Sequence, residues 1–150
     1  MTIKEGEVFA IETKVGFGFL QCVGVDQFGI EIVRVLEPIK ATNEISQAEV
    51  DLPERYTVHF VVKAALRRRL IARTGTFHIP KSYQIPTKAR ERHTVKGEFL
   101  GWHIIDKKTL KRETKQELSP EDLKLSFHGH PNDKLLKEYL ENNWRLENWK

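Results

Sequence analysis

Histidines are the side chains in this sequence best suited to metal or acid–base chemistry. His128 and His130, separated by a single glycine, bring two imidazoles close together, but a zinc site needs three or four ligands. The other histidines, His59, His78, His93 and His103, fall on different predicted elements. We therefore interpret the His128–His130 segment as a polar loop, and we expect no metal site and no cofactor.

Nucleophilic catalysis has equally weak support in the sequence. Cys22 is the only cysteine and lies among apolar residues of a predicted strand, so it is interpreted as a small core residue, and no intramolecular disulfide can form. No serine, histidine or carboxylate lies in a recognised catalytic motif. Gly16 and Gly18 lack the following helix of a dinucleotide-binding loop. The sequence predicts that the protein is not an enzyme; a hydrolase would need a cleft with convergent titratable groups, which a sequence cannot show.

Positive charge is concentrated in the middle of the chain. Residues 63–115 contain fifteen Lys and Arg against four Asp and Glu, although the whole chain has a formal net charge of only +4. Guanidinium groups pair with carboxylates or phosphates, and aromatic rings can stack on bases. This segment is a solvated basic face, a docking face for an acidic protein surface, or a nucleic-acid-binding face. The predicted partner-binding residues are Arg67, Arg68, Arg69, Arg73, Tyr83 and Trp102.

The size and composition indicate one globular domain covering residues 1–150. The first residues lack the apolar core of a signal peptide, and no apolar run approaches the roughly 20 residues of a membrane span. We expect a cytoplasmic protein with no membrane partner. The state of self-association is left open by the sequence.

Short turns separate the β-forming runs of the first part of the chain. Residues 8–13, 17–25 and 30–36 are predicted to form an antiparallel meander, since parallel crossovers need a dozen or more residues. Residues 56–62 predict a fourth strand, residues 69–74 a fifth, and residues 98–105 a later one. Glycines in or beside the first strands indicate either a strongly bent sheet or small barrel, or ordinary turns; they are Gly16, Gly18, Gly24 and Gly29.

The C-terminal part of the chain changes to helical spacing. Ser119 and Asp122 have the spacing of a capping box, and an amphipathic helix is predicted from Asn132 onward, with its apolar stripe packed on the sheet. Residues 79–86 contain two prolines and are expected to be extended and irregular. The fold class is therefore α+β, mainly β: a bent antiparallel sheet or small barrel with one or two C-terminal helices packed on it.

Several of these segments, in this order, resemble the immunity protein 26 family. The opening residues 4–11 and the glycine–aromatic strand 16–23 are similar to the start of that family. Residues 74–80 with Pro86 resemble its mid-chain proline segment, and residues 98–106 resemble its late tryptophan-containing strand.

The resemblance implies a bacterial immunity protein that is encoded beside a toxin and protects the producing cell. It would bind the catalytic domain of the cognate toxin, often a nuclease, and it would carry no catalytic residues. Many nuclease inhibitors are acidic, whereas the middle of this chain is basic, so the contact would use its acidic portions or meet an acidic face of the toxin. The alternative is a small β-barrel nucleic-acid-binding protein that uses residues 63–115.

Overall fold

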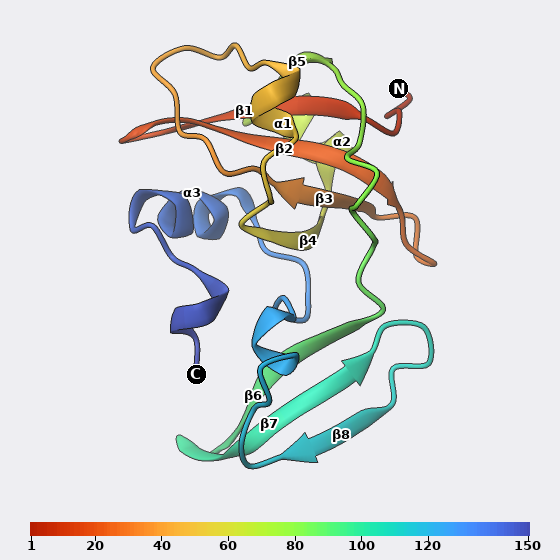
Figure 1. Cartoon of the computed structure of the whole chain (residues 1–150), viewed down its shortest axis with the longest axis vertical. Helices are drawn as coiled ribbons and strands as arrows, with labels where there is room; N and C mark the ends of the chain where they lie inside the picture. The colour runs from red at the N-terminus through yellow and green to blue at the C-terminus, as the bar shows by residue number, and fades with distance from the viewer.

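The computed structural model describes all 150 residues and is mainly β, as predicted. A five-stranded sheet and a three-stranded sheet lie one after the other along the long axis of the molecule (Figure 1). The first sheet contains β1 (Glu7–Thr13), β2 (Gly16–Val25), β3 (Glu31–Val35), β4 (Tyr56–Phe60) and β5 (Ala72–Thr76). The second contains β6 (Lys88–Val95), β7 (Glu98–Asp106) and β8 (Arg112–Lys115). The helical elements are α1 (Gln47–Val50), α2 (Val62–Arg67), η1 (Asp122–Lys124), α3 (Asp133–Glu141) and η2 (Leu146–Asn148).

The larger sheet is an open, bent antiparallel sheet with strand order β4-β3-β2-β1-β5. The predicted meander of the first three strands is confirmed. Register shifts occur between Val8 and Phe9 and between Cys22 and Gly24, and such bulges bend a strand. Because β4 and β5 remain edge strands, the sheet does not close into a barrel.

Both faces of the central strands are buried, which explains their dense apolar composition. The larger core cluster includes Phe9, Leu20 and Val33 and is covered by residues of α2 and α3. From α3, Leu136 and Leu140 are fully or almost fully buried, so the predicted packing of the C-terminal helix on the sheet is confirmed. A smaller cluster on the other face is formed by Val8, Ala10, Phe19, Leu36 and Val50.

Two strands of the second sheet are absent from the sequence-based prediction. Lys88–Val95 and Arg112–Lys115 are rich in charged residues and show no apolar alternation, yet they flank the predicted strand β7. The predicted fourth and fifth strands also need correction. The fourth strand ends at Phe60 instead of residue 62, because α2 begins at Val62. The fifth strand, β5, begins at Ala72 instead of residue 69.

A short C-terminal segment joins the edges of the two sheets. The hydroxyl of Ser126 accepts a hydrogen bond from the amide of Thr57 on β4 (3.0 Å). On β6, the amide of Arg90 donates to the carbonyl of Ser126 (2.9 Å), and the amide of His128 donates to the carbonyl of Arg90 (3.0 Å). This segment therefore connects the two sheets, through backbone pairing with β6 and a side-chain hydrogen bond to β4.

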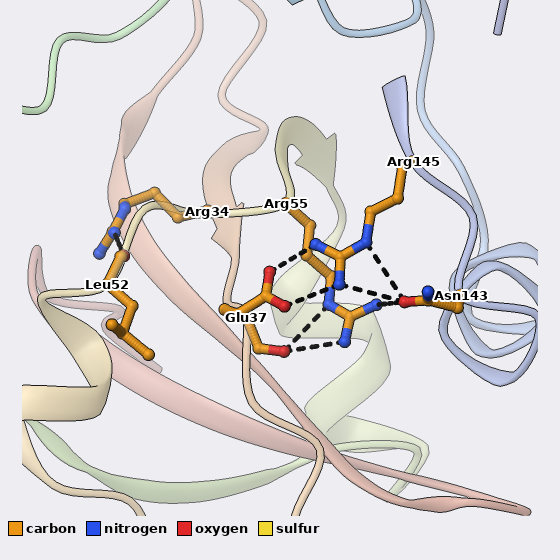
Figure 2. A network of polar contacts seen from close by, with 6 residues as sticks. All are labelled: Arg34, Glu37, Leu52, Arg55, Asn143 and Arg145. Carbon is orange, nitrogen blue, oxygen red and sulfur yellow. Dashed lines mark hydrogen bonds and ion pairs between the residues drawn. The ribbon is translucent and has the colours of Figure 1, made fainter. Parts of the chain in front are cut away.

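A polar network anchors the tail that follows α3. Glu37 lies two residues after the end of β3. Arg145 donates to both carboxylate oxygens of Glu37, and its Nη2 lies 2.7 Å from Oε1. Arg55 donates to the carbonyl of Glu37 and to the side chain of Asn143, so the four residues form one cluster (Figure 2). This network ties the C-terminal tail to the loop between β3 and β4.

Candidate functional site: a histidine-lined pocket at the junction of the two sheets

A cavity of about 230 Å³ opens where the two sheets meet. We call it the junction pocket. Its walls combine residues that are far apart in the sequence: Asp26, Phe28, His59, Ala89, Lys107, Leu110, Phe127, His128, Gly129 and His130.

Asp26 is held rigidly in the turn between β2 and β3. One carboxylate oxygen accepts from the amides of Phe28 (2.8 Å) and Ile30 (3.0 Å), which leaves the other oxygen to face Nδ1 of His59 at 2.7 Å. Burial by itself would raise the pKa of the Asp26 carboxyl, but these amides and His59 outweigh it and lower the pKa. Asp26 is therefore a carboxylate at neutral pH.

His59 connects Asp26 to Lys107. Since Nδ1 of His59 donates to the Asp26 carboxylate, its Nε2 is an acceptor, and the ammonium of Lys107 lies 3.1 Å from that atom. Burial lowers the pKa of His59, with Asp26 opposing the effect, so the imidazole is neutral at neutral pH. Burial also lowers the pKa of Lys107, and the charge of Asp26 opposes it.

His128 and His130 also line the junction pocket. Nε2 of His130 lies 3.9 Å from the Asp26 carboxylate, and the His130 ring centroid lies 6.0 Å from that of His59. Burial lowers the pKa of His128, while the nearby Glu91 opposes this effect. Gly129, between them, has a φ of +107°, a backbone conformation that residues with a side chain rarely adopt. The turn at Gly129 lets both imidazoles line one cavity.

His59 and His130, which lie on different elements, come together in the structure beside Asp26. Ligand atoms of Asp26, His59 and His130 lie within 4.8 Å of one another, a carboxylate and two imidazoles that suit a transition metal by type. However, Nδ1 of His59 is hydrogen-bonded to Asp26 and Nε2 to the ammonium of Lys107, so neither ring nitrogen of His59 is free to bind a metal. We interpret the cluster as a hydrogen-bonded chain from Asp26 through His59 to Lys107.

Two apolar side chains form the exposed rim of the junction pocket. Phe28 is 64% exposed and Leu110 is 42% exposed. Leu110 has a φ of +63°, a left-handed conformation that is costly for such a residue and that clusters at functional sites. The two turns that carry these residues contact each other, because the side chain of Gln27 donates to the carbonyl of Lys108 at 3.4 Å.

The predicted partner-binding residues do not form one site. Arg67, Arg68 and Arg69 are exposed together at the end of α2. Arg68 lines a neighbouring hollow of about 170 Å³ that shares His130 with the junction pocket. Arg68 therefore lies near the junction pocket, on a hollow that meets it at His130, a neighbourhood that no sequence pattern indicates.

The other three predicted residues have structural partners. Arg73 forms an ion pair with Glu7 of β1. The hydroxyl of Tyr83 lies 2.8 Å from that of Thr57. Trp102 is only 3% exposed, so its ring cannot serve as an exposed stacking surface, which corrects that part of the prediction.

Sequence reasoning missed Asp26, His59 and Lys107 as site residues. His59 carried one signal, since it interrupts an otherwise apolar β-forming run and remains partly buried. Asp26 and Lys107 each lie in a turn, where a charged residue needs no special explanation. Only the packing of one sheet against the other brings them together.

None of the helices has the length and hydrophobicity required to span a lipid bilayer. Comparisons of this chain with protein-family models, curated proteins and solved structures give no match.

Proposed function

We propose that this protein is a cytoplasmic immunity protein, which neutralises a cognate bacterial toxin by binding and blocking the toxin's catalytic domain. The resemblance of the sequence segments to the immunity protein 26 family motivates this proposal. Function then depends on a rigid surface with a few anchor residues rather than on turnover. We assign the binding surface to the rim of the junction pocket and the adjoining arginine cluster.

The observation that carries this assignment is the exposure of Phe28 and Leu110 on two turns that are fixed by hydrogen bonds. Aromatic residues such as phenylalanine are enriched in the cores of protein–protein interfaces, and exposed apolar side chains surrounded by polar groups mark interaction surfaces. The Asp26 carboxylate fixes the first turn, and the Asp106 carboxylate accepts from the amides of Lys108 and Thr109 (both 2.9 Å) in the second. A preorganised turn loses little conformational freedom on binding.

The proposal is tested with the product of the gene adjacent to the one that encodes this protein. We expect the two proteins to co-purify as a stoichiometric complex and expect this chain to restore growth to cells that express the toxin. Phe28→Ser is expected to weaken the complex by at least tenfold. Val15→Ser is the matched control, because Val15 is 55% exposed in the turn between β1 and β2, at the opposite end of β2.

An adjacent gene that encodes no toxin, together with no rescue of growth, would reject this function. Binding to DNA or RNA that weakens steeply with salt would instead support the nucleic-acid alternative. In that case, charge reversal at Arg67, Arg68 and Arg69 should abolish binding, whereas Phe28→Ser should have little effect.

A further inference from the structure

The ammonium of Lys107 is incompletely paired. Lysine has three N–H donors, and one is used by the neutral ring nitrogen of His59. No Asp or Glu oxygen lies within 4.0 Å of this ammonium, in contrast to Lys40 and Lys115, which each form an ion pair with a carboxylate. Lys107 is also partly buried and faces the junction pocket.

A partly buried cation without a counter-ion is costly unless a negative group can approach it. The remaining donors of Lys107 are the natural partners of an oxygen anion, and charge-assisted hydrogen bonds of this type are the strong ones. The His128 and His130 imidazoles line the same space, and a neutral imidazole carries one ring N–H that can donate to an anion.

The size of the cavity limits what can enter. A volume of about 230 Å³ lies below the roughly 300–1,000 Å³ of typical small-molecule sites. It suits a single side chain better than a nucleotide. Phe28, Leu110 and Phe127 give its walls an apolar character, which matches the methylene groups of an acidic side chain.

We propose that the junction pocket receives the carboxylate of one Asp or Glu side chain of the partner protein, and that Lys107 binds this carboxylate directly. This inference rests on the proposed function, and it identifies the partner face as acidic. Phe28 and Leu110 contact the surface around the inserted side chain and exclude water from the ion pair. His59 acts as a positioning residue, because its tautomer is set by Asp26 and leaves Nε2 to hold the Lys107 ammonium.

The first experiment does not require the partner. Acetate is titrated into isotope-labelled full-length protein, and the side-chain resonances of Lys107, His128 and His130 are followed by NMR. We expect saturable shifts at millimolar acetate that disappear in Lys107→Met and persist in Lys108→Met, since Lys108 is exposed and adjacent in sequence. Absence of saturable shifts in the wild-type protein would overturn the proposal. Much tighter binding of inorganic phosphate than of acetate would overturn it in favour of a phosphate site.

The second experiment measures the dissociation constant of the toxin complex by calorimetry. Loss of one partner of a desolvated ion pair predicts at least a 30-fold weakening for Lys107→Met. Lys107→Arg keeps the charge and should retain most of the affinity, and Lys108→Met should bind like the wild type. Thermal unfolding of each variant verifies that it is folded.

The third step is a charge exchange. Lys107→Glu should abolish binding, and one Asp→Lys or Glu→Lys substitution on the toxin should restore it. If the wild-type complex forms but Lys107→Met binds normally, the carboxylate site is wrong and the proposed function stands. If acetate binds at Lys107 but no wild-type complex forms, the proposed function fails and the partner assignment fails with it.

Discussion

Lys107 extends from the end of β7 in the three-stranded sheet to within 3.1 Å of Nε2 of His59 on β4 of the five-stranded sheet. The ammonium and the imidazole thus meet across the junction of the two sheets. The same two groups connect the sheets and line the junction pocket, so we expect stability and the proposed binding to depend on one contact. Both properties can be measured separately.

The first prediction concerns pH. The pKa of His59 is lowered from an ordinary value of 6.5 by burial, with Asp26 opposing, and the charged Lys107 and the neighbouring His130 also lower it. As the pH falls below about 6.5, the unfolded chain therefore gains a proton before the folded protein does. The free energy of unfolding should decrease from pH 7.5 to pH 5.5, and the contribution of His59 to this decrease should level off below its lowered pKa.

Urea denaturation at several pH values tests this prediction. In His59→Gln the decrease over this range should be smaller than in the wild type. The remaining slope should come in part from His128, whose pKa is also lowered by burial. An identical pH dependence in the two proteins would contradict the assignment.

The second prediction separates stability from binding at Leu110. Its φ of +63° costs a residue with a side chain roughly 1–2 kcal/mol. Glycine avoids this cost, although it loses more backbone entropy on folding than leucine does. Leu110→Gly should therefore stabilise the protein by about 0.5–1 kcal/mol and weaken toxin binding. Leu110→Ala removes the same side chain but keeps the backbone strain, so it should weaken binding without stabilising the fold.

The third prediction concerns the packing of α3 on the sheet. A methyl group added at Gly18 would lie 2.6 Å from Cδ1 of Leu140, so Gly18→Ala should destabilise the protein by about 1–3 kcal/mol. Leu140→Ala should cost about 2–5 kcal/mol by leaving a cavity. In the double mutant the added methyl group occupies that space, so the combined loss should be smaller than the sum. Additive losses in chemical denaturation would show that the contact is not tight.

The fourth prediction concerns the buried guanidinium of Arg90. It donates to the carbonyls of Leu123 (3.3 Å), Leu125 (3.0 Å), Leu146 (2.8 Å) and Trp149, and burial lowers its pKa to about 10. Arg90→Met would leave several carbonyls unpaired at roughly 1–3 kcal/mol each, and a loss of at least 3 kcal/mol is expected. Arg92→Met on the same strand is the control and should change stability by less than about 1 kcal/mol, since Arg92 is exposed and lies over the rings of Phe99 and Trp102 without a hydrogen bond to a buried carbonyl.

The fifth prediction assigns a kinetic role to Arg67, Arg68 and Arg69. Exposed charges at the border of a binding surface mainly accelerate association. Replacement of all three by Gln should lower the association rate with the toxin about tenfold at low salt and leave the dissociation rate nearly unchanged. The difference in association rate between this variant and the wild type should disappear at 0.5 M salt, because charges are then screened over roughly 4 Å. A large change in the dissociation rate would instead place these arginines inside the contact.

Local patterns predicted the elements whose apolar residues alternate or recur at helical spacing. The meander, β7 and α3 belong to this group, and Asn132 caps α3 as its residue type predicts. β6 was missed because one of its buried residues is an arginine, Arg90. Arg90 can be buried only because backbone carbonyls from later in the chain surround its guanidinium. A pattern confined to neighbouring residues cannot contain that information.

The junction pocket was missed for the same reason. His59 and Lys107 are separated by 48 residues, and their contact depends on how one sheet lies against the other. The predicted arginine cluster was found because its three residues are consecutive. Function-bearing groups that a single segment supplies can be recognised in a sequence, whereas those that converge from separate sheets require the tertiary structure.

The hydrogen bonds of Ser126 and His128 to the edges of the two sheets have a consequence for biosynthesis. Until this segment leaves the ribosome, the edges of β4 and β6 have no partner, and unpaired edges attract other chains. Ser126 follows Thr57 by 69 residues, so at roughly 5–20 residues per second this edge of β4 stays uncovered in the nascent chain for several seconds. The two sheets can therefore be joined only after residues 126–128 have been synthesised, so their docking comes late relative to the synthesis of their strands.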